Sequence, residues 1–316
     1  MASTFSSVAG MFPENSASPK ELSYLVNCVS PSYAGARIGL SRVCRRAACW
    51  PVALLATFWP GGAGAQAPSY TAANFVNASN YSAGPFAPNS AVSLFGSNLC
   101  FNTALATSGV PLPTSLGGTS VLVFNSAVPL LYVSSGQINF LIPSDQTDGA
   151  ISVQVVRQGL AGPVVTLTLV DAAPAPFVDA LHYALAEDWN QNYALVNAAN
   201  PAQPGDTIVL YLTGMGHTLP NPSPGAALAT AAPLANPSEL SVLLNGAALN
   251  PASILYAGAT PDFAGLYQIN FTLPMNIAAN PEIRVSMAGQ TSPAGVLLAV
   301  QPMQPVQLDE VPVRKP

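Results

Sequence analysis

Apolar and polar residues alternate in short segments along most of the chain. In the segment 137–142, Ile138 and Phe140 lie on one side of the pattern, and Gln137 and Asn139 lie on the other. A period of two indicates a strand with one buried face. Similar segments of four to eight residues recur, each bounded by Pro, Gly, Asn or Ser, which is typical of strands joined by turns. The pattern therefore predicts an all-β fold.

The strand pattern occurs twice. The sequence Gln-Ile-Asn-Phe at 137–140 returns at 268–271. Three more pairs follow the same order: 88–96 with 204–211, 120–125 with 241–246, and 130–132 with 254–256. About seven short strands in about 100 residues is the size of an immunoglobulin-like sandwich. We predict two tandem sandwiches, over 68–173 and 174–303, with the border in the Pro-rich segment 172–176.

A secretory signal is predicted over 42–67. Arg45 and Arg46 precede a largely apolar run at 47–59, and small residues follow at the end. This order is that of a signal peptide, with cleavage after Ala65 or Ala67. The alternative is a membrane anchor, but the run is shorter than the roughly 20 residues that span a bilayer. The signal predicts an extracellular or cell-surface location.

The two ends of the chain lack a fold pattern. We interpret 1–41 as an unstructured leader; either translation starts near Val43 or the signal has an unusually long n-region. Residues 304–316 are expected to form a flexible tail. The predicted sandwiches therefore contain neither segment.

Composition adds a constraint on partners. Only 7% of the residues are charged, against about one quarter in ordinary domains. After the predicted cleavage, four basic and twelve acidic residues remain, a net charge of 4 − 12 = −8. No basic stripe is present, so nucleic acid is excluded as a partner. Cys100 is the one cysteine after the signal, so no internal disulfide is possible. It is expected to be a small buried residue, and the alternative is an intermolecular bridge.

Several motifs together resemble a known family. They are 83–99, 111–118, 137–143 with 268–274, 200–205 and 213–216. In this combination they resemble the Solibacter-type C-terminal domain of acidobacterial secreted proteins, and each half resembles an IPT/TIG domain. The resemblance implies immunoglobulin-like folds and an extracellular, non-enzymatic module. It carries no catalytic residues over to this chain.

Candidate chemistry is sparse. Hydrolysis needs a nucleophile with a base, or a metal with an open site. The two histidines, His182 and His217, belong to no recognised catalytic motif. Asp145 and Asp148 suit either a turn or Ca²⁺, and a turn explains them without a metal. We therefore predict no enzyme activity, no cofactor and no metal.

Two sets of residues are candidates for binding. Trp189, with Asn190 and Asn192, lies in a polar stretch that reads as a hairpin tip; an aromatic face beside amides suits a sugar, and the alternative is a turn folded back onto its own sheet. The repeated signature contains Gln137, Asn139 and Phe140 in the first half, and Gln268, Asn270 and Phe271 in the second. Its amides are expected to hydrogen-bond neighbouring loops or strand edges, because buried amides need partners.

These observations predict a secreted or cell-surface structural or adhesive module. A glycan-binding module is the alternative, and a hydrolase ranks last. The partner would be an extracellular glycan or a cell-surface protein.

Overall fold

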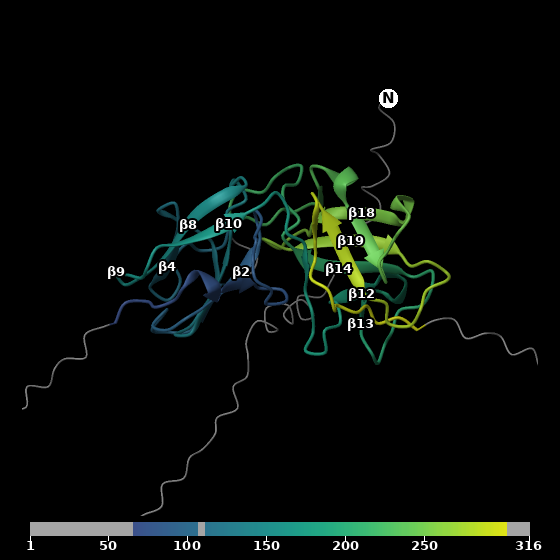
Figure 1. Cartoon of the computed structure of the whole chain (residues 1–316), viewed down its shortest axis with the longest axis horizontal. Helices are drawn as coiled ribbons and strands as arrows, with labels where there is room; N and C mark the ends of the chain where they lie inside the picture. The colour runs from purple at the N-terminus through teal and green to yellow at the C-terminus, as the bar shows by residue number, and fades with distance from the viewer. Residues whose placement is uncertain (1–65, 107–110, 302–316) are drawn as a thin grey trace, which may run out of the picture.

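The computed structural model describes residues 66–106 and 111–301. Almost all of the predicted leader and signal, and the predicted tail, lie outside these residues. The described chain consists of antiparallel sheets and short 3-10 turns. The prediction of an all-β fold is confirmed. Figure 1 shows two lobes side by side, the earlier residues in one and the later residues in the other.

The first lobe is a pair of sheets. One sheet has the order β1-β2-β7-β6-β3 and the other the order β10-β8-β4-β5, with β9 paired to β8. Their bounds are β1 (Phe75–Asn77), β2 (Ala91–Phe95), β3 (Ala104–Leu105), β4 (Thr119–Val123), β5 (Ser126–Ala127), β6 (Leu130–Val133), β7 (Gln137–Leu141), β8 (Gly149–Arg157), β9 (Leu160–Ala161) and β10 (Val165–Leu169).

The second lobe is also a pair of sheets. One has the order β13-β12-β14-β19-β18-β15, with β11 paired to β14, and the other the order β17-β16-β20-β21. Their bounds are β11 (Ala175–Pro176), β12 (Ala186–Asp188), β13 (Ala194–Val196), β14 (Thr207–Thr213), β15 (Ala232–Pro233), β16 (Ser241–Leu244), β17 (Ala247–Ala248), β18 (Ile254–Ala259), β19 (Tyr267–Thr272), β20 (Ile283–Met287) and β21 (Gln290–Thr291).

The two lobes match in detail. The order β2-β7-β6-β3 in the first corresponds to β14-β19-β18-β15 in the second. Phe95 lies opposite Gln137 in one, and Tyr211 lies opposite Gln268 in the other. A register shift follows Leu130 in β6, and a shift follows Ile254 at the same point of β18. The bulge bends the strand at one position in each lobe.

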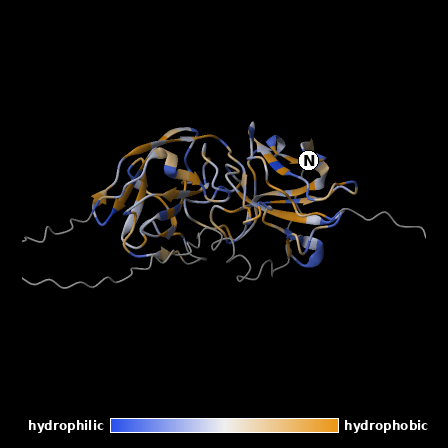
Figure 2. Cartoon of the chain, turned by 60° about the horizontal axis from the view of Figure 1, so that its bottom comes forward, coloured by the Kyte–Doolittle hydropathy of each residue, from blue (hydrophilic) through white to orange (hydrophobic). Residues whose placement is uncertain are grey.

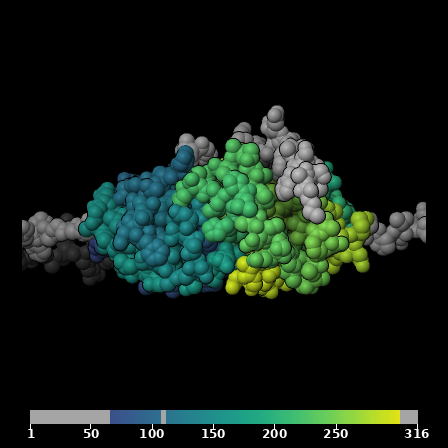
Figure 3. Space-filling view, turned by 90° about the horizontal axis from the view of Figure 1, so that it is seen from above, coloured from purple at the N-terminus to yellow at the C-terminus, as the bar shows by residue number. Residues whose placement is uncertain are grey.

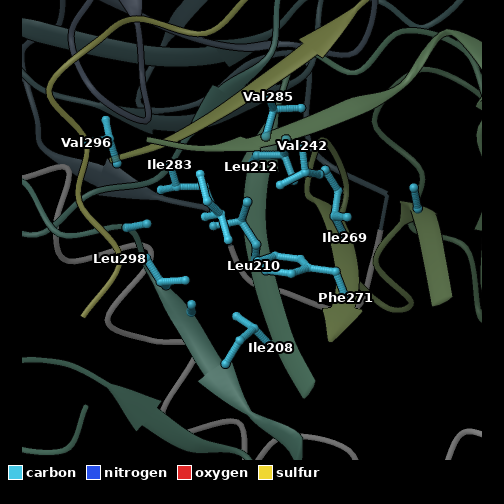
Figure 4. Close-up of a cluster of buried hydrophobic side chains, with 14 of the residues drawn as sticks. Ile208, Leu210, Leu212, Val242, Ile269, Phe271, Ile283, Val285, Val296 and Leu298 are labelled. Carbon is cyan, nitrogen blue, oxygen red and sulfur yellow. The ribbon is translucent and has the colours of Figure 1, made fainter. Parts of the chain in front are cut away.

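Each lobe has its own core between its sheets. Ile138 and Phe140 are fully buried in the first core, and Ile269 and Phe271 in the second. Figure 4 shows Phe271 with the apolar side chains of β14 around it. Figure 2 shows apolar colour on the strands of both lobes and polar colour on many connecting loops. The alternation in the sequence therefore places one set of side chains in each core.

The segment between the lobes is short. The first lobe ends at Leu169 with β10, and β11 begins at Ala175. The side chain of Ala172 already packs into the second core. Strands β12 and β13 also belong to the second lobe. The separate folding of 68–173 and 174–303 stays a prediction.

Candidate ligand-binding site

A hairpin at one edge of the seven-stranded sheet carries the candidate residues. Strands β12 and β13 pair antiparallel, and the 3-10 turn η3 (Trp189–Gln191) begins the connection. Asp188 caps this turn: its Oδ1 accepts from the amide of Asn190 at 2.8 Å. A carboxylate at such a position satisfies an amide that the turn leaves free. The polar stretch therefore forms a hairpin tip, where the sequence places it.

Two aromatic rings lie at this tip. Those of Trp189 and Tyr193 have centroids 5.3 Å apart and planes inclined at 50°. Both side chains are half-buried. They pack against a cluster on the outer face of the sheet, on the side away from the second core. We call this cluster the aromatic face; it contains Phe177, Leu185, Trp189, Tyr193, Val209, Tyr211, Phe263 and Leu266.

A buried carboxylate lies within the aromatic face. The Tyr211 hydroxyl donates to Oε2 of Glu187 at 2.8 Å, and both side chains are 5% exposed. Burial, and then the charge of Glu187, raise the pKa of Tyr211 far above its ordinary range. Burial and the same carboxylate also raise the pKa of Tyr193. Both tyrosines therefore keep their protons, and the Tyr211 hydroxyl serves as the donor to Glu187.

A second carboxylate pair lies beside the hairpin. Burial raises the pKa of Asp188, and the neighbouring side chain of Asp206 raises it further. Oδ2 of Asp188 accepts from Gln191 at 2.7 Å, and Oδ2 of Asp206 accepts from the Gln203 amide at 2.7 Å. Like charges at close range favour one protonated group. Asp188 and Asp206 thus form one coupled carboxyl pair beside the hairpin.

The candidate amides have different positions. Oδ1 of Asn190 accepts from the amide of Thr207 at 2.8 Å, which ties the hairpin to the start of β14. Asn192 has φ 55° and its amide donates to the Trp189 carbonyl at 3.2 Å. Its side chain is exposed. The structure therefore brings Trp189, Asn190 and Asn192 together in one turn, and gives Asn190 a structural bond as well.

Sequence reasoning missed Glu187, Tyr211 and Phe177 as parts of this face. Tyr211 lies within the run Ile-Val-Leu-Tyr-Leu of β14, which looks like a strand buried on both sides. For Tyr211, the repeat in the sequence offered a signal. Phe95 lies opposite Gln137 in the first lobe, as Tyr211 lies opposite Gln268 in the second.

The repeated amides bond to each other. Nε2 of Gln137 donates to Oδ1 of Asn139 at 2.9 Å, and Nε2 of Gln268 donates to Oδ1 of Asn270 at 3.1 Å. Ser93 of the adjacent strand also donates to Asn139, at 2.8 Å. All four amides are buried on the outer faces of their sheets. Each of these bonds is made within the amide's own sheet.

The other candidate residues lie apart from the hairpin. Asp145 and Asp148 lie in an exposed turn between β7 and β8, and half-buried His217 lies between β14 and β15. His182 is exposed in a turn before β12. Within 66–106 and 111–301, no group of three His, Cys, Asp or Glu side chains is placed to hold a metal ion. The thiol of buried Cys100 is not in a disulfide, and it donates to the carbonyls of Asn102 and Gly117 at 3.1 and 3.2 Å.

The fold defines an all-β protein of immunoglobulin-like sandwiches. No helix in the described ranges has the length and apolar character of a membrane span. No protein-family model matches the chain, and no curated protein matches it. The resemblance to the Solibacter-type family stays a prediction.

Solved structures are similar to this chain at low identity. One is SGBP-B from a complex xyloglucan utilization locus in Bacteroides uniformis, at 9% identity and TM-score 0.23, covering 68% of this chain and 46% of that one. Another is the surface glycan-binding protein PbSGBP-B from Prevotella bryantii, at 14% identity and TM-score 0.22; the match covers 66% of this chain and 36% of that one. Titin A168169 is similar at 11% identity and TM-score 0.21; the match covers 68% of this chain and 93% of that one. The chain thus spans less than half the length of the two glycan-binding proteins, and its function has to be argued from its own residues.

Proposed function

We propose that the chain is an exported, non-catalytic adhesive module whose two sandwiches form one rigid body. The observation that carries this is the hydrogen-bonded junction between them. Oγ1 of Thr213, at the end of β14, accepts from the amide of Ala91 in β2 at 3.0 Å. The same hydroxyl donates to the carbonyl of Gly265 at 3.0 Å. Thr213 is fully buried, so both bonds are made away from water.

Further bonds cross the junction. The hydroxyl of Tyr267, also fully buried, accepts from Nδ2 of Asn89 at 3.2 Å and donates to the Gly216 carbonyl. The Ser144 hydroxyl donates to the Pro222 carbonyl at 2.6 Å. Figure 3 shows the two lobes meeting over a broad contact. Independent motion is the usual expectation for neighbouring domains, but here it would break the bonds that the Ala91 amide, Asn89 and Ser144 make across the junction, at about 0.5–1.5 kcal/mol for each.

A rigid pair of sandwiches suits adhesion or spacing. Such a module presents a surface at a fixed distance and angle, and it has no need of a catalytic centre. The exposed turn of Asp145 and Asp148 and the separate position of His217 give no support to a hydrolase. The alternative, a glycan-binding module, is favoured by the aromatic hairpin, in which Trp189 and Tyr193 lie beside exposed amides.

Unfolding of the separate halves tests the junction. Residues 66–303 are expected to melt in one transition, at a higher temperature than either 66–173 or 174–303 alone, because each half loses its partners across the junction and 174–303 also loses Ala172 from its core. The measurement is differential scanning calorimetry, with Thr213→Val in the whole chain to remove the bridging hydroxyl. Two transitions at the temperatures of the isolated halves would show that the junction stabilises nothing.

The start of the mature chain bears on export. Arg157 is 3% exposed, and its guanidinium donates to the carbonyl of Gln66 while stacking 3.9 Å from the Phe101 ring centroid. Of the two predicted cleavage positions, the one after Ala65 keeps Gln66 and the one after Ala67 removes it. Removal would leave a buried charged donor short of an acceptor. We propose cleavage after Ala65.

The two possible mature chains are expected to differ in stability. A chain starting at Gln66 should be more stable than one starting at Pro68 by about 1–3 kcal/mol, the cost of a lost buried hydrogen bond. Urea unfolding of 66–303 and 68–303 measures the difference. Mass spectrometry of the exported protein identifies its first residue, and an exported protein that begins at Met1 or at Pro68 would contradict the proposal.

A further inference from the structure

We propose that the tip of the β12–β13 hairpin binds an uncharged sugar chain. Trp189 and Tyr193 supply the stacking surface, and the exposed amides of Asn190, Gln191 and Asn192 supply hydrogen bonds. This inference goes beyond the adhesive function by giving it a ligand class. It does not depend on the junction between the sandwiches, because every one of these residues lies in the second sandwich.

The ring pair has the chemistry to bind a sugar. A pyranose presents C–H groups on its faces and hydroxyls at its edge, so it fits an aromatic ring bordered by polar groups, and Trp and Tyr combine an apolar body with a polar end. Trp189 and Tyr193 are both half-buried, which leaves part of each ring accessible to solvent. Their planes differ by 50°. The pair therefore cannot lie flat on a crystalline surface, but it can follow a single twisted chain.

The amides lie where sugar hydroxyls would meet them. Asn190, Gln191 and Asn192 are exposed and lie between the two rings in the sequence. The Asn192 side chain makes no hydrogen bond with any residue that the structure describes. An amide both donates and accepts, as a hydroxyl does. At the tip, the ring pair lies beside three exposed amides, a combination that suits a sugar.

The hairpin is organised before any ligand arrives. Asn192 and Tyr193 have φ values of 55° and 60°, a left-handed conformation that costs an aromatic residue energy. The amide of Tyr193 donates to the Asp188 carbonyl at 2.9 Å, and Asn190 is bound to Thr207. These bonds hold in place the backbone that carries both rings. A ligand that meets a fixed surface loses less free energy to ordering the loop.

The surrounding charge selects against acidic sugars. Glu187, Asp188 and Asp206 lie beside or beneath the hairpin. The described residues contain two basic side chains: Arg157 lies in the first sandwich and Arg284 donates to the Ser292 carbonyl at 2.7 Å in the other sheet. Among the described residues, no Lys or Arg side chain lies at the hairpin, and the acidic groups beside it oppose a carboxylate or a sulfate. The ligand is therefore an uncharged sugar chain.

Fluorescence of Trp189 can report binding directly. Trp50 and Trp59 precede Ala65, so Trp189 is the single tryptophan of 66–303. This protein is titrated with cellohexaose, maltohexaose and mannohexaose, and with hexagalacturonate as the acidic counterpart. At least one neutral hexaose is expected to shift the Trp189 emission and to give a calorimetric binding curve. Hexagalacturonate is expected to do neither.

Variants locate the site. Trp189→Ala is expected to weaken calorimetric binding about tenfold or more, as the loss of a central aromatic anchor does. Asn192→Gly suits the left-handed backbone and removes only the amide, so it should fold normally and bind several-fold more weakly. Tyr81→Ala is the matched control, because Tyr81 also has a left-handed φ of 58° and contacts another ring, that of Phe95.

Three outcomes would overturn the proposal. They are the absence of binding to any neutral hexaose, equal binding of hexagalacturonate, and an equal loss of binding in Tyr81→Ala. Specific capture of a protein without any sugar binding would assign the hairpin to a protein partner and would also contradict it. The melting experiment on the two halves is unaffected by all of these results, so a failure here leaves the rigid-module proposal intact.

Discussion

Phe271→Ala is expected to lower the free energy of unfolding by about 3–5 kcal/mol, the range for a buried Phe. Phe271 is fully buried in β19, opposite Ile208 of β14 and Ile254 of β18. Truncation leaves a cavity in the second core, between its two sheets. The loss is a large part of the roughly 5–15 kcal/mol that keeps a domain folded.

Phe140→Ala is expected to have the same effect on the first sandwich. Phe140 lies opposite Val92 and Leu130, and its ring meets that of Phe75 edge-on, at 6.2 Å and 86°. The matching positions of Phe140 and Phe271 give the two variants matching costs. Urea unfolding followed by circular dichroism measures both.

Gln268→Ala is the control for the Phe variants. It removes the donor to Asn270 on the other face of the same strand, which should cost about 1–3 kcal/mol. The order of the effects is the test. If the Phe variants unfold like the wild type while Gln268→Ala is strongly destabilised, the assignment of the two faces of β19 is wrong.

The core positions could be predicted because the alternation of apolar and polar residues in a strand indicates which side chains are buried. Ile138 and Phe140 alternate with amides, and the same alternation returns at Ile269 and Phe271. The all-β class follows from such segments and the turn residues between them. Neither conclusion needs a long-range contact.

The outer face and the junction could not be predicted in this way. Tyr211 and Glu187 are close because β12 and β14 pair, and pairing partners distant in the sequence leave no local signal. The same holds for Thr213 and Ala91, which are 122 residues apart. The motif 213–216 was visible in the sequence, but its role at the junction depends on the packing of both sandwiches.

Gly214→Ala is expected to be the strongest single test of that junction. Gly214 has φ 77°, and a methyl group on it would overlap the carbonyl oxygen of Ala173 and lie 3.2 Å from Oγ of Ser90. The Gly214 carbonyl also accepts from the Ala173 amide at 2.7 Å. A left-handed backbone costs a non-glycine residue about 1–2 kcal/mol, and the overlap with a backbone oxygen adds to this, because relief requires the linker to move away from β14.

Gly246→Ala separates these two contributions. Gly246 has φ 78°, the same conformation, but a methyl group there meets nothing within 4 Å, and the residue is exposed in the turn between β16 and β17. It should therefore cost only the backbone term, about 1–2 kcal/mol. Gly214→Ala is expected to cost at least about 3 kcal/mol and to increase proteolysis between 170 and 175, since the linker loses its place against the second sandwich. Urea unfolding and limited proteolysis of both variants measure this. Equal losses in the two variants, with no new cleavage in the linker, would mean that the linker is not held by Gly214 and that the two sandwiches are joined less rigidly than the junction bonds imply.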